Sequence, residues 1–105
     1  MTWLLRRRVS PVRAGRRPAL VIASDLYLEQ ADTLAIIVPV TTNNRGWPNH
    51  VLLKGPGLAL DQPSFAMTEQ PRTVTRDRLF EPAGIVDRAT MTAVDGWLRD
   101  FLALP

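Results

Sequence analysis

Residues 33–40 read TLAIIVPV, and this apolar run does most to decide the fold. Its many β-branched residues predict a buried strand, and the run is far too short to span a bilayer. Pro39 cannot donate to a central ladder, so we expect a strand end, an edge or a bulge there. Residues 18–24, PALVIAS, form a second apolar run that opens with a proline, as a first strand residue may be, and they predict another strand.

The rest of the chain divides into short elements separated by proline and glycine. We expect a helical turn at 25–32, a polar loop at 41–48, a strand at 49–54, a turn at 55–57, strand pieces at 64–70 and 72–75, and a short strand at 84–86. The last segment, 87–104, predicts an amphipathic helix with Asp87 as its N-cap. Many short strands and one helix indicate a single domain, 1–105, folded as a mainly β, strongly curved small barrel closed by a C-terminal helix.

The composition excludes several kinds of site. The chain has no cysteine and one histidine, and its ten acidic residues are dispersed, so we expect no metal and no cofactor. There is no Gly-rich phosphate loop and no Gly-x-Ser-x-Gly motif. The first residues, MTWLLRRR, do not resemble a signal peptide, which favours a cytoplasmic protein. Any phosphoryl chemistry must therefore use arginine and hydroxyl groups.

The positive charge is concentrated in residues 1–17, a basic N-terminal segment with six arginines and no acidic residue. The other 88 residues carry seven Lys or Arg and ten Asp or Glu. Such a cluster indicates a polyanionic partner, either nucleic acid or anionic lipid, and Arg6 to Arg8 are candidates for phosphate contacts. The alternative is a solubilising or frayed terminus.

Three motifs occur in a specific order and spacing. They are GRRPALVI at 15–22, VPVTTNNRGWP at 38–48, and EQ-x-RTV at 69–74, the last followed by Arg78-Leu79. Together with the C-terminal helix, they resemble the MazF/PemK toxins over residues 15–104. The resemblance implies a Src-homology-3-like barrel of the CcdB/PemK toxin type.

The same resemblance implies the toxin of a toxin–antitoxin system. Members of that family are metal-independent, sequence-specific endoribonucleases that cut single-stranded RNA, such as mRNA, to 2′,3′-cyclic phosphate and 5′-hydroxyl ends. It also implies a homodimer and a cognate antitoxin whose acidic segment occupies the RNA groove. The family's catalytic arginine and threonine correspond to Arg17 and Thr41.

The chemistry of these two side chains suits such roles. A guanidinium stays protonated in proteins and can stabilise the negative charge of a phosphorane, while a hydroxyl can orient a phosphate oxygen. The candidates for RNA binding are Arg16, Thr42, Asn43, Arg45, Trp47 and Arg72. Trp47 could stack on an unpaired base, or it could anchor its loop on the barrel.

Two alternatives remain open from the sequence. A gyrase poison of the CcdB type would share the fold but would not need Arg17 and Thr41 together. A toxin that binds RNA without cutting it is the second alternative, because the loop glutamate of the family is missing here. His50 could act as an acid or base, but we favour a structural role for it.

Overall fold

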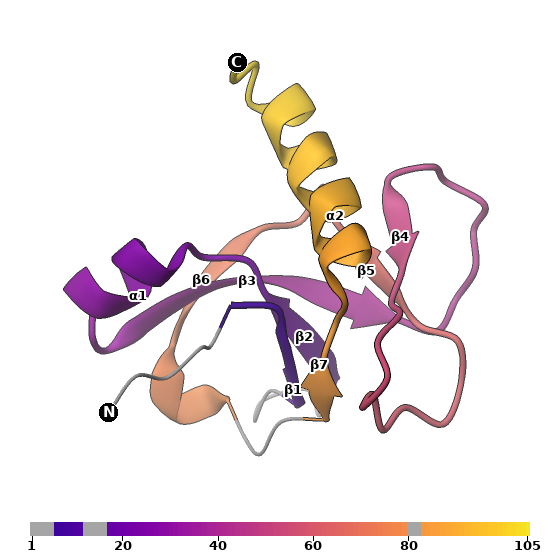
Figure 1. The fold of residues 1–105 in the computed structure, drawn as a ribbon, viewed down its shortest axis with the longest axis horizontal. Helices are drawn as coiled ribbons and strands as arrows, with labels where there is room; N and C mark the ends of the chain where they lie inside the picture. Colours follow the sequence, from indigo (N-terminus) through magenta and orange to yellow (C-terminus); the bar gives the residue numbers. More distant parts are fainter. Residues whose placement is uncertain (1–5, 12–16, 80–82) are drawn as a thin grey trace.

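A sheet of seven short antiparallel strands dominates the computed structural model, which describes residues 6–11, 17–79 and 83–105 (Figure 1). The elements in chain order are β1 Arg8–Pro11, β2 Pro18–Val21, α1 Asp25–Gln30, β3 Leu34–Thr41, β4 His50–Leu52, β5 Phe65–Met67, β6 Arg72–Thr75, a 3₁₀ turn Arg76–Arg78, β7 Gly84–Ile85 and α2 Arg88–Phe101. The strand order is β4-β5-β3-β2-β1-β7, and β6 pairs with β3 beside this path. The expectation of a mainly β, strongly curved fold with a C-terminal helix is confirmed.

The longest strand, β3, organises the sheet. One edge pairs with β2, while the other pairs first with β6 and then with β5. Pro39 lies between Ile37, the last residue paired with β6, and Val40, the first paired with β5. Its missing N–H therefore falls where the strand changes partner, which is how a proline is accommodated within this strand.

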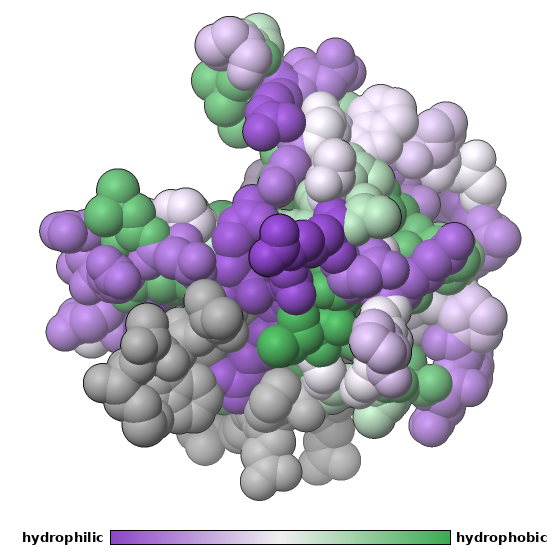
Figure 2. Space-filling view, viewed as in Figure 1, coloured by the Kyte–Doolittle hydropathy of each residue, from purple (hydrophilic) through white to green (hydrophobic). Residues whose placement is uncertain are grey.

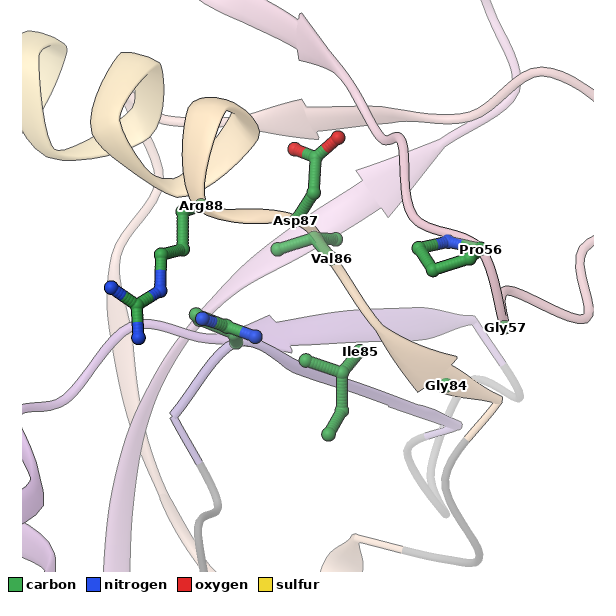
Figure 3. A pocket seen from close by; sticks show the side chains of 8 residues that line it. Pro56, Gly57, Gly84, Ile85, Val86, Asp87 and Arg88 are labelled. Carbon is green, nitrogen blue, oxygen red and sulfur yellow. The ribbon is translucent and has the colours of Figure 1, made fainter.

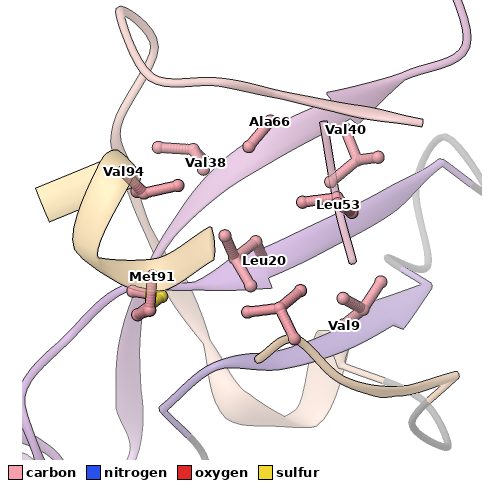
Figure 4. Close-up of a cluster of buried hydrophobic side chains, with 9 residues drawn as sticks. Val9, Leu20, Val38, Val40, Leu53, Ala66, Met91 and Val94 are labelled. Atoms are coloured by element: carbon pink, nitrogen blue, oxygen red, sulfur yellow. The ribbon is translucent and has the colours of Figure 1, made fainter. Parts of the chain in front are cut away.

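The larger hydrophobic core lies between the concave face of the sheet and α2 (Figure 4). Its buried residues are Val9, Leu20, Val38, Val40, Leu53, Ala66, Val86, Met91 and Val94. Met91 and Val94 come from α2, at the three-residue spacing of one helical face. This helix therefore covers the sheet, as the apolar pattern of its sequence predicts.

A smaller core lies on the opposite face of the sheet, beneath α1. Its buried residues are Ala19, Val21, Ala23, Leu28, Ala35 and Ile37. Side chains alternate along β2, so Ala19 and Val21 face this core while Leu20 faces the larger one. Both faces of β2 are buried, which explains why residues 18–23 are apolar throughout.

Helix α1 is fixed at both ends by side chains. The Ser24 hydroxyl accepts a hydrogen bond of 3.1 Å from the Tyr27 N–H at the N-terminus. At the other end, the Arg76 guanidinium donates to the carbonyl oxygens of Leu28, Ala31 and Leu34. Of these three, the Leu28 carbonyl lies in the last turn of α1, where carbonyl groups lack partners within the helix.

We expect Arg76→Ala to lower the free energy of unfolding by about 1.5–3 kcal/mol, because hydrogen bonds from a charged donor to part-buried carbonyls are lost. Urea unfolding followed by circular dichroism measures this change. Arg78→Ala, in the same 3₁₀ turn, is the matched control and should change stability by less than about 0.5 kcal/mol. Equal losses in the two variants would contradict a specific role for Arg76.

Helix α2 is shorter than the sequence predicts. It begins after the N-cap Asp87, whose carboxylate accepts from the Thr90 N–H at 2.8 Å. Hydrogen bonding with the side chain and the backbone of Thr90 lowers the pKa of the Asp87 carboxyl. It ends at Phe101 rather than continuing to 104, since Ala103 has a φ of 54°. The Leu104 N–H then donates to the Arg99 carbonyl at 2.8 Å, which closes the helix in a Schellman-like turn.

The N-terminal arginines lie in a different setting from the solvated tail that their charge suggests. Strand β1 pairs with β2 and β7, and Val9 and Ser10 are buried. Arg6 forms an ion pair with Asp95 of α2 at 2.7 Å. The sequence analysis did not predict this strand, because three consecutive arginines precede its only two buried residues.

The segment after β4 brings the two edges of the curved sheet together. The Asp87 N–H donates to the Lys54 carbonyl, and the Ala59 N–H donates to the Ala83 carbonyl, each at 2.7 Å. Gly84 has a φ of 119°, and a Cβ atom there would lie 2.5 Å from the Gly57 carbonyl oxygen. In the part of the chain that the structure describes, no helix is long and apolar enough to cross a membrane.

Candidate active site

Arg17 and Thr41 are brought together by the register of β2 and β3. Ala19 of β2 pairs with Pro39 of β3, and continuing this register by two residues, past Pro18 at the start of β2, sets Arg17 across from Thr41. Side chains at this spacing lie on one face of the sheet, the face opposite the larger core. Two residues 24 positions apart therefore share one site.

Arg17 and Thr41 both line a hollow of about 420 Å³. The other residues that line it are Pro18, Val40, Thr42, Asn43 and Arg45. The Asn43 N–H donates a hydrogen bond of 3.1 Å to the Thr41 hydroxyl oxygen. Because this bond occupies a lone pair, the Thr41 hydroxyl keeps its proton available to donate to a ligand.

The loop 42–49 forms one wall of this hollow. The Asn44 side-chain oxygen accepts from the Gly46 N–H at 3.0 Å, and Gly46 has a φ of 74°. This is an Asx-turn, so Asn44 has the turn-forming role that asparagine commonly takes. The Arg45 guanidinium lies over the Trp47 ring, 5.3 Å from its centroid, and 46% of Trp47 is exposed.

A second hollow of about 490 Å³ continues from the first, sharing Arg17 and Pro18 with it. Its other lining residues are Ala19, Ile37, Pro39, Met67, Gln70, Arg72, Thr73, Val74 and Arg78. Arg72 pairs with Ile37 of β3, on the same face as Arg17, and donates to the Gln70 side-chain oxygen at 3.2 Å. We call the two hollows together the groove.

The groove is strongly basic. Arg17, Arg45, Arg72 and Arg78 line it, and none of its described lining residues is an Asp or a Glu. Its floor between the arginines is apolar, formed by side chains such as Ile37 and Pro39. A basic rim around an apolar floor suits a ligand that carries both phosphates and flat bases.

The potential metal ligands of the described residues do not cluster. No group of three or more His, Asp or Glu side chains among them could hold a metal ion. His50 is 7% exposed, and its Nε2 lies 3.1 Å from both carboxylate oxygens of Glu69. Desolvation raises the pKa of the Glu69 carboxyl, but hydrogen bonds from its own backbone and from His50 outweigh that effect and lower the pKa overall. The favoured structural role of His50 agrees with this burial.

A larger hollow, of about 540 Å³, lies at the N-terminus of α2 (Figure 3). Arg7 and Arg88 line it together with Ile85, and Asp87 is already engaged as the helix cap. It contains no hydroxyl side chain that could work beside the arginines. We therefore place the candidate active site in the groove rather than here.

The structure gathers most of the predicted site residues. Arg17, Thr41, Thr42, Asn43 and Arg45 share the first hollow, and Arg72 lies in the second. Trp47 does not line either hollow but contacts Arg45, while Arg16 lies outside the described residues.

The sequence analysis did not select Arg78 or Gln70 as site residues, although both occur in or beside the motif at 69–74. Arg6 is paired with Asp95 of α2 and is no longer a candidate for phosphate contact.

Comparison with known proteins decides the family. Residues 3–102 match the family described as the PemK-like, MazF-like toxin of type II toxin–antitoxin systems. The chain belongs to this family. It is also 33% identical over 95 residues to endoribonuclease MazF9 of Mycobacterium tuberculosis, a match that covers 86% of this chain and 80% of that protein.

Solved structures of MazF proteins have the same fold. A mycobacterial endoribonuclease in complex with its cognate antitoxin is 27% identical, with a TM-score of 0.78, and 98% of each chain is covered. The MazE–MazF complex of Deinococcus radiodurans is 25% identical with a TM-score of 0.79, covering 93% of this chain and 94% of the other. The expected CcdB/PemK-type barrel is therefore confirmed.

Proposed function

We propose that this PemK/MazF-family toxin is a metal-independent endoribonuclease that cuts single-stranded RNA in the groove, with Arg17 and Thr41 as its catalytic residues. The observation that supports the proposal is that Arg17, just before β2, and Thr41, the last residue of β3, line one basic hollow, where the Asn43 N–H orients the Thr41 hydroxyl. The name of the relative MazF9 supports the activity. The proposed location is the cytoplasm, where mRNA is available.

The proposed reaction is attack by a ribose 2′-hydroxyl on its own 3′-phosphorus. As the new O–P bond forms, the 2′-hydroxyl loses its proton to water. The bond to the 5′-oxygen breaks, and that oxygen takes a proton from water, which leaves a 2′,3′-cyclic phosphate and a 5′-hydroxyl. Arg17 donates two hydrogen bonds to the phosphorane oxygens, whose negative charge grows in the transition state. The Thr41 hydroxyl accepts from Asn43 and donates its own proton to a phosphate oxygen, which fixes the phosphate for in-line attack.

The remaining lining residues would hold the RNA on either side of the cut. Arg45 at one end of the groove and Arg72 at the other are positioned to neutralise phosphates, and the floor near Ile37 and Pro39 offers an apolar surface for a base. Thr42 and Asn43 lie beside Thr41, where their polar groups can bond base edges.

The activity is tested by incubating the purified protein with a long single-stranded RNA in excess EDTA and sequencing the new ends. We expect cuts within one short sequence. Uncut RNA would remove the endoribonuclease proposal and would restore two alternatives, a toxin that only binds RNA and a gyrase poison of the CcdB type. A parallel filter-binding assay and a DNA supercoiling assay separate those two.

The arginines of the groove lead to a second prediction, on how RNA affinity depends on salt concentration. Single-strand binding weakens with salt by about 0.7 log units per log unit of salt for each phosphate neutralised, so Arg72→Ala and Arg78→Ala should each lower the slope by about that amount. Arg88→Ala, which removes an exposed arginine at the start of α2, is the matched control and should leave the slope unchanged. A slope that drops equally in all three variants would indicate nonspecific attraction rather than a binding groove.

We further propose a homodimer that uses the end of α2. Phe101, Leu102 and Leu104 are 47%, 62% and 55% exposed, and Figure 2 shows apolar atoms at the free end of this helix. The Trp97 and Phe101 rings lie 5.9 Å apart, extending the apolar face along the helix. A small domain gains stability when a second copy covers such a surface.

The dimer proposal predicts the behaviour of one variant. Phe101→Ser should shift the sedimentation coefficient toward that of a monomer, because it removes a large apolar side chain from the proposed interface. Leu26→Ser, which changes an exposed leucine of α1, is the control and should leave the assembly unchanged. A monomeric wild-type protein would contradict the proposal.

The antitoxin is the second proposed partner. The similar mycobacterial endoribonuclease was solved in complex with its cognate antitoxin, and the similar MazF of Deinococcus radiodurans in complex with MazE. An acidic, extended segment would complement the four arginines of the groove, so antitoxin and RNA would compete for it.

A further inference from the structure

One ion pair, between the buried His50 and the partly exposed Glu69, has no part in the proposed chemistry. His50 opens β4 and is 7% exposed, and its Nε2 lies 3.1 Å from each carboxylate oxygen of Glu69. A carboxylate only accepts, so Nε2–H donates to it. The His50 Nδ1 is also buried and has no hydrogen-bond partner among the described residues. Burying the polar His50 ring costs free energy that an apolar ring of similar size would not cost.

The pair fastens the end of the loop 42–49 to the turn that follows β5. Glu69 Oε1 also accepts from the Asn49 side-chain amide at 3.0 Å. The Thr68 hydroxyl donates to the Asn49 carbonyl at 2.6 Å, and the His50 N–H donates to the Trp47 carbonyl at 3.0 Å. The end of the loop is therefore held to residues 68–69 by several hydrogen bonds. Glu69 accepts two of them, one from Asn49 and one from His50.

The fastened end is connected to the groove by contacts of two rings and one guanidinium. The His50 and Trp47 ring centroids are 4.8 Å apart. The Arg45 guanidinium lies over the Trp47 ring, 5.3 Å from its centroid. Arg45 in turn lines the hollow that contains Arg17 and Thr41. A continuous series of contacts thus runs from Glu69 through His50 and Trp47 to Arg45.

We propose that His50 and Glu69 are positioning residues for RNA binding, since they fix Trp47 and thereby hold Arg45 against the groove. This inference rests on the proposed function. It assigns to Glu69 an effect on RNA affinity although Glu69 does not line the groove. The chemical step should depend on it much less, because Arg17 directly precedes β2, Thr41 ends β3, and Thr41 is oriented locally by Asn43.

The test compares Glu69→Ala, Glu69→Gln and Arg45→Ala in RNA cleavage. Glu69→Ala removes the acceptor of bonds from two residues, so we expect KM to rise about tenfold or more. The single-turnover rate at saturating RNA should stay within about threefold of wild type. Glu69→Gln keeps one acceptor oxygen for His50 and Asn49 and should restore most of the affinity. Glu29→Ala, at an exposed acid on α1, is the control for loss of one negative charge.

A double-mutant cycle separates positioning from ordinary destabilisation. If Glu69 acts through Arg45, the double variant Glu69→Ala/Arg45→Ala should raise KM no more than the larger single change. Additive effects, or a fall in the saturated rate with an unchanged KM, would overturn the proposal. Thermal melts confirm that each variant is folded, and Glu69→Gln remains informative where Glu69→Ala is not.

Hydrogen exchange of the free protein provides a readout that needs no RNA. The amides of Gly46, Trp47, Asn49 and His50 should exchange faster in Glu69→Ala than in wild type or Glu29→Ala, since the bonds holding this end of the loop are lost. Unchanged protection there would overturn the proposal. A wild-type protein that cuts no RNA would contradict the proposed function but would not test the role of Glu69. The exchange result alone decides whether Glu69 holds the loop.

Discussion

Arg17→Ala and Thr41→Val are each expected to lower the single-turnover rate of RNA cleavage by roughly 10² to 10³, with a much smaller effect on RNA binding. Losing one fixed donor to a developing oxyanion typically costs about 2.7–4 kcal/mol in the transition state. Both groups are proposed to meet charge and geometry that exist mainly in that state, so the ground-state complex loses less. Rapid-quench cleavage and filter binding measure the two effects separately.

The controls for this prediction use the same chemistry elsewhere. Arg17→Lys should recover little, because an ammonium cannot reproduce two parallel hydrogen bonds. Thr33→Val, just before the other end of β3, makes the same change as Thr41→Val and should leave the rate unchanged. The double variant at Arg17 and Thr41 should cost less than the sum of the single variants, since both act on one phosphate. Single variants that cut within a few-fold of wild type would remove the catalytic assignment.

The largest expected effect on stability is that of Gly84→Ala. A Cβ atom there would lie 2.5 Å from the Gly57 carbonyl oxygen, and the φ of 119° is strained for any L side chain. We expect the free energy of unfolding to fall by about 2–4 kcal/mol, and Tm by roughly 10–20 °C. Differential scanning calorimetry measures both quantities.

Gly57→Ala is the matched control, because a Cβ atom there meets no heavy atom within 4 Å. It should leave Tm nearly unchanged. A Gly84→Ala variant as stable as Gly57→Ala would show that β7 and the segment 54–59 do not close the barrel as tightly as this structure describes.

Local sequence patterns were sufficient for the elements that carry their own signals. The apolar runs at 18–24 and 33–40 predicted β2 and β3, and Asp87 with the helical spacing after it predicted the start of α2. The motifs at 15–22 and 38–48, through their resemblance to the family, predicted Arg17 and Thr41 as the catalytic residues. Their meeting in one hollow, however, depends on the register of two strands, which no single segment encodes.

The features that were missed all depend on contacts distant in sequence. Strand β1 is four residues long, and its burial becomes visible only when β2 and β7 pair with it. Arg78 lines the groove because β6 pairs with β3, and the 3₁₀ turn that contains Arg78 directly follows β6. Glu69 meets His50 across the β4–β5 pairing, 19 residues away, and neither position has a local pattern that predicts the contact.

The central claim is that Arg17 and Thr41 promote attack by a ribose 2′-hydroxyl without a metal. The most direct measurement uses a mapped RNA oligonucleotide in excess EDTA, with and without a single 2′-deoxy nucleotide on the 5′ side of the cut. We predict that the all-ribose strand yields a 2′,3′-cyclic phosphate and a 5′-hydroxyl, and that the 2′-deoxy strand stays intact. Cleavage of the 2′-deoxy strand, or products with 5′-phosphate ends, would contradict the account.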